Sequence, residues 1–373
     1  MRESTSRLLV EAVARRYLRE MRKDPERGIR NLMDMALQFS EGRFQQSLFR
    51  AARTLLEKED SAYYGLVRDT LAHVEDSRLL SFGMNLGYNG CTAGARHIRE
   101  NEDRLHCRIP WIVTFRLEPE TFARHRLSYH TAIREGEGLG IHCWILAADR
   151  QPQAFLELAA RHPDSAFFLF CNPGEITGPL RERLIRLPNV MPVVRLEEAA
   201  ASVYAGLRDA GLLYSLYAPY HPESWEDIRS GRLFRRAQRH APFFTVLAAG
   251  PTCSPALRQA VHQAAVGFRA SQEFRTIPWE LSQDNQLVDA MISEDACTAL
   301  FDTHGRLCIR GDPVRPGAAS LFQLHLPDIF QSCFGRAPAA AGASAGPQTL
   351  PEAYCFCPEA IAPGRTKWRP QKS

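Results

Sequence analysis

Six short apolar runs, spaced regularly between residues 109 and 250, constrain the fold of this chain more than any other feature. Each run is bounded by Gly, Pro, Asn or charged residues, and segments of helical character lie between the runs. The runs are Trp111–Phe115, Ile141–Ala147, Ala166–Cys171, Val190–Leu196, Leu212–Ala218 and Phe243–Ala249. The helical segments are 121–137, 151–161, 178–187, 197–210, 222–239 and 254–268. Successive strand–helix units predict a parallel sheet, and nearly continuous apolar strands indicate burial on both faces.

This periodicity fits both a full or partial (β/α) barrel and a doubly wound open sheet. In a barrel, functional residues gather at the carboxyl ends of the strands. Those ends carry Arg116, Glu118, Asp149, Arg150, Asn172, Glu175, Arg195, Glu197, Tyr217, Tyr220, His221, Thr252 and Cys253. The set predicts a polar mouth of mixed charge that holds a ligand, although such residues also cap helices.

The flanking regions differ from this pattern. We expect helices at 7–23, 27–38, 43–57, 61–82 and 93–104, and the three glycines of 83–90 predict a loop. Segments 299–301 and 307–309 flank a glycine-containing turn and predict a hairpin. The expected divisions are a helical region (1–108), a barrel (109–290), a hairpin-containing extension (291–334), a flexible linker (335–351) and a cysteine-containing basic tail (352–373).

Composition narrows the class of protein. Hydrophobic residues make up 45% and charged residues 24%, which excludes a mostly disordered or collagen-like chain. No apolar run approaches the ~18 residues that span a bilayer, and the polar start Met1–Ser4 does not resemble a signal peptide. We therefore expect a cytoplasmic protein without a membrane partner. The net charge is +4, but acidic residues alternate with the arginines, so no nucleic-acid partner is expected.

Ten cysteines raise the question of a metal. Cys143 and Cys171 lie within predicted strands, where a thiol packs as a small hydrophobe. Cys333, Cys355 and Cys357 are candidate metal ligands, but their irregular spacing equally fits incidental thiols.

Two further motifs have ordinary structural explanations. His125 and His130 are five residues apart, which does not place two imidazoles on one helical face, so we expect a solvated helix surface. Gly136, Gly138 and Gly140 follow a helix and precede a strand, the reverse of a dinucleotide-binding loop, and indicate a helix-to-strand turn.

Several stretches, taken in order, resemble one family. They are Tyr17–Arg27 with Leu32–Asp34 in the first helices, Ile98–Glu100 with Ile109–Trp111 before the first strand, Gly138–Ile141 before the second, Thr303–Leu307 in the hairpin, and Cys357 with Pro358. Together with the strand–helix units, they resemble the radical S-adenosylmethionine (radical SAM) proteins. The resemblance implies an α/β fold, a partial (β/α)6 TIM-like barrel with a helical N-terminal region and a small C-terminal extension.

The chain departs from that family where the cofactor binds. Active members carry C-x-x-x-C-x-x-C after the first strand, and its thiolates bind a [4Fe–4S] cluster that holds S-adenosylmethionine. The motif is absent, and its positions fall on Thr121, His125 and Ser128. The family's Gly-Gly-Glu-Pro after the second strand is replaced by the degenerate SAM-binding stretch Ala147, Ala148, Asp149 and Arg150. Arg310 stands near the place of a cysteine expected after the hairpin.

We therefore expect a degenerate radical SAM-like barrel, a pseudoenzyme that binds a ligand or partner. Its partner would be an active radical SAM homologue, a peptide or a small molecule. No cofactor is expected, with S-adenosylmethionine or a metal at the C-terminal cysteines as alternatives. The candidate ligand-binding residues are Asp149, Asn172, Glu175, Arg195, Tyr217, Tyr220 and His221.

Two other hypotheses remain open. One is an enzyme with repurposed, non-radical chemistry, in which Asp149 or His221 acts as acid or base and Arg195 holds an anion. The other is an iron–sulfur or zinc protein built on the C-terminal cysteines.

Overall fold

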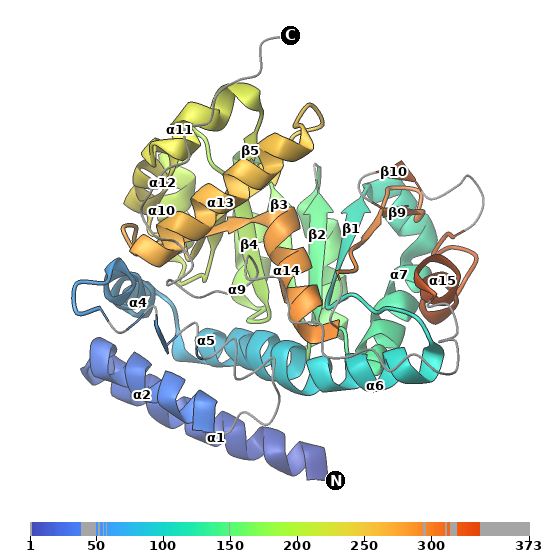
Figure 1. Ribbon diagram of the computed structural model, residues 1–373, viewed down its shortest axis with the longest axis horizontal. Coiled ribbons are helices and arrows are strands. Elements are labelled where there is room, and N and C mark those ends of the chain that lie inside the picture. The colour runs from blue at the N-terminus through green and yellow to red at the C-terminus, as the bar shows by residue number, and fades with distance from the viewer. Residues whose placement is uncertain are drawn as a thin grey trace, which may run out of the picture. The chain divides into compact units, whose positions relative to one another are not determined.

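The computed structural model describes residues 2–38, 50, 53–54, 56, 58–148, 150–293, 296–309, 312–313 and 319–335 (Figure 1). The chain divides into two units, Met1–Pro338 and Ala339–Ser373. The second unit lies outside the described residues, as do Arg310 and nearly all of the predicted linker and tail. Within the described residues, no helix is both long and apolar enough to cross a membrane.

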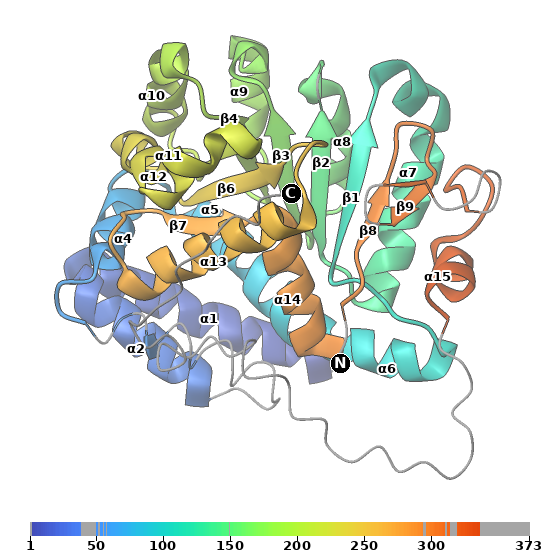
Figure 2. The same ribbon diagram turned by 45° about the horizontal axis from the view of Figure 1, so that its top comes forward.

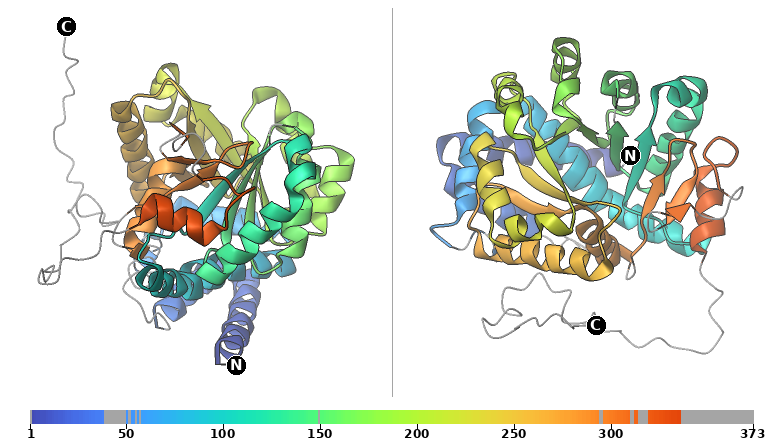
Figure 3. Two further views of the ribbon diagram at one scale, coloured as in Figure 1. Left: turned by 90° about the vertical axis from the view of Figure 1, so that its right-hand side faces the viewer. Right: turned by 90° about the horizontal axis from the view of Figure 1, so that it is seen from above.

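A single, mostly parallel sheet forms the centre of the first unit and curls into a half-barrel (Figures 2 and 3). Its strand order is β10-β9-β8-β1-β2-β3-β4-β5-β6-β7. All six predicted runs are strands, namely β1 (Ile112–Leu117), β2 (Cys143–Ala148), β3 (Ala166–Cys171), β4 (Val190–Arg195), β5 (Ser215–Tyr220) and β6 (Phe244–Ala249). A further parallel strand, β7 (Ile277–Glu280), follows β6 and was not predicted. Its four residues Ile-Pro-Trp-Glu include a proline and carry no apolar run.

Helices connect the strands, and most of them cover the outside of the sheet, whereas α14 lies on its inner side (Figure 1). They are α7 (Pro119–Leu139), η2 (Pro152–Phe155), α8 (Leu156–Arg161), η3 (Pro173–Glu175), α9 (Gly178–Ile185), η4 (Glu198–Ala200), α10 (Ala201–Asp209), η5 (Pro222–Ser224), α11 (Trp225–Arg229), α12 (Arg232–Ala237), η6 (Gln238–His240), α13 (Pro255–Ser271) and α14 (Leu281–Ser293). Side chains at the strand ends begin several of them: Thr177 and Ser254 accept backbone N–H groups of α9 and α13.

The predicted turn before β2 is confirmed at Gly140. This residue ends α7 with φ +103°, a left-handed conformation that favours glycine. A Cβ at Gly140 would lie 2.5 Å from the carbonyl oxygen of Gly94, so the absence of a side chain also permits close backbone packing.

The N-terminal region is helical, as predicted, and lies beneath the sheet (Figure 1). Its elements are α1 (Arg2–Lys23), α2 (Pro25–Gln38), α4 (Ala62–His73), α5 (Asp76–Gly83), the π-helix η1 (Met84–Gly94) and α6 (Ala95–Leu105). The helix predicted at 61–82 is two helices, because Val74 adopts an extended conformation. Most of the helix predicted at 43–57 lies outside the described residues.

The loop predicted at 83–90 was wrong, because these residues form the end of α5 and most of η1. Buried Asn85 and Asn89 donate hydrogen bonds to the carbonyl groups of residues 163–165 in the turn before β3. A Cβ at Gly90 would lie 2.9 Å from Cys143 Sγ. The asparagines and this glycine therefore serve close packing under the barrel rather than a turn.

The predicted hairpin is confirmed: β8 (Ala299–Phe301) and β9 (Leu307–Ile309) are antiparallel. Gly305 occupies the turn with φ +69°. β8 also pairs in parallel with β1, so the extension continues the central sheet. After β10 (Asp312–Pro313), helix α15 (Leu326–Phe334) packs against α7, as Figure 3 shows.

Candidate ligand-binding site

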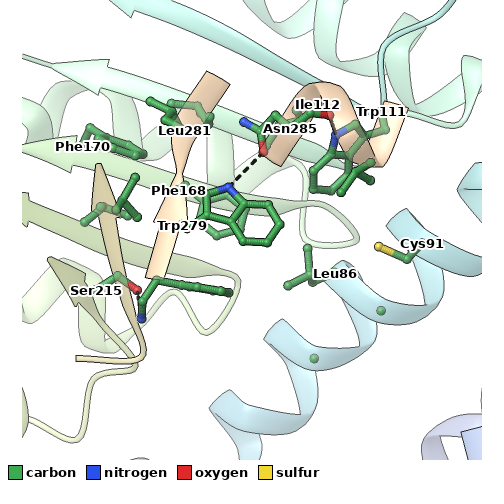
Figure 4. A pocket seen from close by; sticks show the side chains of 17 residues that line it. Leu86, Cys91, Trp111, Ile112, Phe168, Phe170, Ser215, Trp279, Leu281 and Asn285 are labelled. Carbon is green, nitrogen blue, oxygen red and sulfur yellow. Dashed lines mark hydrogen bonds between the residues drawn. The ribbon is translucent and has the colours of Figure 1, made fainter. Parts of the chain in front are cut away.

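A cavity of about 320 Å³ lies inside the half-barrel (Figure 4). The inner face of the sheet forms one side, and η1 and α14 form the others. Its lining residues are Gly83, Leu86, Gly87, Cys91, Trp111, Ile112, Ile145, Phe168, Phe170, Val193, Ser215, Phe244, Val246, Trp279, Leu281, Asn285 and Val288. The volume falls within the range of small-molecule sites.

Strand periodicity places these side chains in the interior. Successive residues of a strand point to opposite faces, so alternate positions line the cavity, such as Phe168 with Phe170 and Phe244 with Val246. Residues that point to the opposite face, such as Phe167, Leu169 and Leu247, are fully buried in the hydrophobic core.

The few polar atoms in the wall are largely satisfied. Ser215 Oγ accepts the Phe244 N–H at 3.1 Å and donates to Met191 Sδ at 3.1 Å. The Trp111 indole donates to the Asn285 backbone carbonyl at 3.1 Å. The Trp279 indole donates to Asn285 Oδ1 at 3.3 Å, the contact dashed in Figure 4.

No side chain in the wall is suited to acid–base chemistry. Within the part of the chain that the structure describes, the lining residues include no Asp, Glu, His, Lys or Arg. Cys91 is the one thiol among them, and burial raises its pKa to about 12, so it stays protonated.

Two arginines extend the rows of residues that line the cavity. Arg116 pairs in register with Ala147, which pairs with Phe170, and Phe170 pairs with Val193. Arg195 pairs with Tyr217, which pairs with Val246, and Val246 with Trp279. Both arginines therefore lie on the inner face at the carboxyl ends of their strands.

Each of these arginines is available to a ligand. Arg116 is exposed, and none of the described carboxylates forms an ion pair with it. The Arg195 side chain is 47% exposed and approaches Glu197 at 3.8 Å, a weak surface pair.

The other predicted mouth residues are only partly brought together. The Tyr217 hydroxyl lies 3.4 Å from Asn172 Oδ1, and the Tyr217 ring contacts Phe170. Glu175 accepts the backbone N–H of Gln151 at 2.9 Å. His221 caps η5 and lies 3.5 Å from Thr252 Oγ1.

Tyr220 faces away from the cavity. It is fully buried, and its hydroxyl donates to Glu280 at 2.8 Å. Because Tyr217 and Tyr220 are three residues apart on one strand, they point to opposite faces of the sheet. This difference could have been predicted from the alternation of side chains along the strand.

The degenerate SAM-binding stretch closes β2. Ala147 and Ala148 are its last residues, and Asp149 lies outside the described residues. Arg150 is exposed and reaches Glu118 at 3.4 Å and Glu120 at 3.6 Å, both at the start of α7.

The three degenerate cluster positions lie on α7, which begins directly after β1. The backbone N–H and hydroxyl of Thr121 both donate to Glu118 at 2.9 Å, and the bond to the N–H lowers the pKa of Glu118. The His125 ring stacks on Phe322 of the extension, with centroids 3.8 Å apart. Ser128 lies one turn further along, half-buried.

The prediction of a solvated surface at His125 and His130 was wrong, since both are half-buried. His130 lies in a chain of contacts that sequence reasoning missed. It is 3.2 Å from Glu157 and 3.2 Å from His162, and His162 is 3.1 Å from Glu137. Burial lowers the pKa of His130, although the bond with Glu157 acts in the opposite direction.

A second titratable cluster lies behind β7, outside the cavity. Asp284 accepts two hydrogen bonds from Arg269 and one from His262, and these partners hold its pKa below the ordinary value despite burial. Burial raises the pKa of the neighbouring Glu280. Asp284 also accepts the Glu280 N–H at 2.7 Å, so the cluster ties β7 to α13 and α14.

The described cysteines fit the prediction of small buried hydrophobes. Cys143 and Cys171 are buried in the core, whereas Cys333 is half-buried on α15. Cys355 and Cys357 lie outside the described residues. Among the residues that are described, no three His, Cys, Asp or Glu side chains gather as a metal site.

Comparison with known proteins gives similarity at the level of the fold. The sequence matches no protein-family model, and no curated protein matches it. Three crystal structures of Streptococcus suis SuiB match the fold. The SuiB complex with S-adenosylmethionine has a TM-score of 0.48 and 11% identity, covering 65% of this chain and 69% of SuiB. SuiB alone (0.45, 10%) covers 65% and 71%, and its complex with the precursor peptide SuiA (0.45, 12%) covers 64% and 69%.

Proposed function

We propose that this protein is a degenerate radical SAM-like barrel that binds a small molecule in its interior without transforming it. The cavity carries the proposal: it has the size of a ligand site and an almost wholly apolar wall, and its described residues include no acid or base. The titratable clusters around Asp284 and His130 lie elsewhere, in hydrogen bonds that join elements of the fold.

The residues that follow β1 do not fit a thiolate-bound cluster. Segment 112–139 contains no cysteine. The Thr121 hydroxyl donates a hydrogen bond to Glu118, and the His125 ring stacks on Phe322. Iron–sulfur clusters require thiolates, with histidine as an occasional replacement, so one imidazole and two hydroxyls are a poor ligand set.

The geometry also favours binding over repurposed catalysis. Among the groups considered for an acid–base mechanism, His221 contacts Thr252 and Arg195 contacts Glu197, and neither lines the cavity. The proposal places Asn172, Arg195 and Tyr217 at the rim of the ligand site.

Anaerobic reconstitution with iron and sulfide, followed by reduction with dithionite in the presence of S-adenosylmethionine, tests the proposal. We expect no 5′-deoxyadenosine above the level of a heat-denatured control. Turnover to 5′-deoxyadenosine would overturn the non-catalytic assignment.

A further inference from the structure

Resting on the proposed binding role, we propose that the ligand is an aromatic carboxylate, with its ring in the cavity and its carboxylate at Arg116 and Arg195. The apolar wall selects the ring, and the two guanidinium groups select the anion.

The wall favours an aromatic body over a polar one. Trp111, Trp279, Phe168, Phe170 and Phe244 contribute five aromatic side chains to the lining. Transfer of apolar surface from water is favourable by about 25 cal/mol per Å², and ring pairs add to this gain. A charged group in the same space would find no counter-ion among the described residues of the wall.

One polar group in the wall remains available. An indole N–H only donates, so the Trp279 contact fixes the Asn285 amide with its oxygen toward Trp279. The Asn285 side-chain nitrogen has no hydrogen-bond partner within the described residues, and it is not sealed from solvent. A single donor accommodates the π-face or one acceptor of an aromatic ligand.

The arginines lie where a carboxylate on a short arm would reach. In the register of the sheet, Arg116 is level with the lining residues Phe170 and Val193. Arg195 is two residues beyond Val193 on β4, which is roughly 7 Å at about 3.3 Å per residue. Guanidinium binds carboxylate through two parallel hydrogen bonds, which makes arginine suited to this head group.

Two glycines of η1 and α7 provide a matched test of occupancy. Gly87 lines the cavity, and a Cβ there would meet no atom within 4 Å. Gly138 is also helical and equally open, but it lies on the exposed surface of α7. Gly87→Leu should therefore fill the cavity without a backbone clash, while Gly138→Leu makes the same chemical change outside it.

Isothermal titration calorimetry with 4-phenylbutyrate, its uncharged analogue 4-phenylbutanol, and decanoate tests the proposal on the full chain. We expect 4-phenylbutyrate to bind at least tenfold more tightly than either. Gly87→Leu should abolish binding of 4-phenylbutyrate, and Gly138→Leu should leave it unchanged. Circular dichroism of both variants confirms that they fold.

Charge selection is tested by Arg116→Gln combined with Arg195→Gln. We expect this pair to weaken 4-phenylbutyrate at least tenfold and 4-phenylbutanol less than twofold. The control pair Arg229→Gln with Arg232→Gln changes exposed arginines whose ion pairs lie on α11 and α12, and should change neither.

Three outcomes would overturn the inference. Equal affinity for 4-phenylbutyrate and 4-phenylbutanol would show that the site does not select a carboxylate. Tighter binding of decanoate would show that it does not select an aromatic ring. No binding of any of the three compounds would contradict the proposed class of ligand. None of them alters the result of iron–sulfur reconstitution, so failure of this inference is distinguishable from failure of the proposed function.

Discussion

Arg78 links helix α5, which leads into the cavity-lining helix η1, to helix α9 of the barrel. Its replacement should change the free energy of unfolding by a predictable amount. Arg78 is 4% exposed and lies on α5, which continues into η1. Its guanidinium donates to the carbonyl groups of Leu184, Ile185 and Leu187 at 3.0, 2.7 and 2.9 Å, at the carboxyl end of α9. Burial lowers the pKa of Arg78, so desolvation offsets part of the gain from these bonds.

We expect Arg78→Met to lower the free energy of unfolding by about 3 kcal/mol. Hydrogen bonds to a charged group each contribute about 1.5–3 kcal/mol, and the avoided desolvation of the guanidinium reduces their sum. Arg78→Lys keeps the charge but loses the planar fork, so its loss should be intermediate. Urea denaturation at pH 7, followed by circular dichroism, measures the change at constant slope.

A loss below about 1 kcal/mol for Arg78→Met would refute this reasoning, because the three bonds would then contribute less than a single neutral hydrogen bond. The exposed Arg229, which pairs with Glu226 on α11, provides the control. Arg229→Met should change stability by less than about 0.5 kcal/mol.

Two further predictions concern backbone and charge. Gly140→Ala should lower the free energy of unfolding by about 2 kcal/mol or more, because Gly140 has a positive φ and an added Cβ would clash with Gly94. Gly138→Ala should raise the free energy of unfolding by about 1 kcal/mol, because alanine favours the helix more than glycine does. Urea denaturation measures both changes. Burial raises the pKa of Asp289, although its Oδ1 accepts the Trp111 N–H, which acts in the opposite direction. The folded state therefore holds a proton that the unfolded state releases, and stability falls as pH rises above the ordinary carboxyl range. Asp289→Asn should remove this pH-dependent loss of stability. The melting temperature of the variant minus that of the wild type should therefore increase from pH 5 to pH 8. A difference that stays constant over this range would contradict a raised pKa for Asp289.

The six central strands were predictable because burial on both faces leaves nearly continuous apolar runs. β7 was not, since Pro278 and Glu280 interrupt its short sequence. The glycines of η1 led to the wrong prediction of a loop. Glycine permits a turn, but it also permits close packing of the backbone, as at Gly90 against Cys143. Sequence alone does not separate these two uses.

The candidate site was predictable only along single strands. Arg116, Arg195 and Tyr217 follow from strand ends and alternation, and the same alternation should have set Tyr220 apart. The contacts of Asn285 with Trp111 and Trp279 join α14, the start of β1 and β7, and they depend on how the half-barrel closes around its interior. Nothing local in the sequence indicates that convergence.

Iron content after anaerobic reconstitution, measured on the wild-type chain and on a variant with Cys333, Cys355 and Cys357 all replaced by serine, tests the central claim most directly. We predict that the variant retains no iron and shows no cluster absorbance, because the strand β1 and helix α7 segment, 112–139, contains no cysteine. The claim would be contradicted if the variant held about four irons per chain and produced 5′-deoxyadenosine from S-adenosylmethionine.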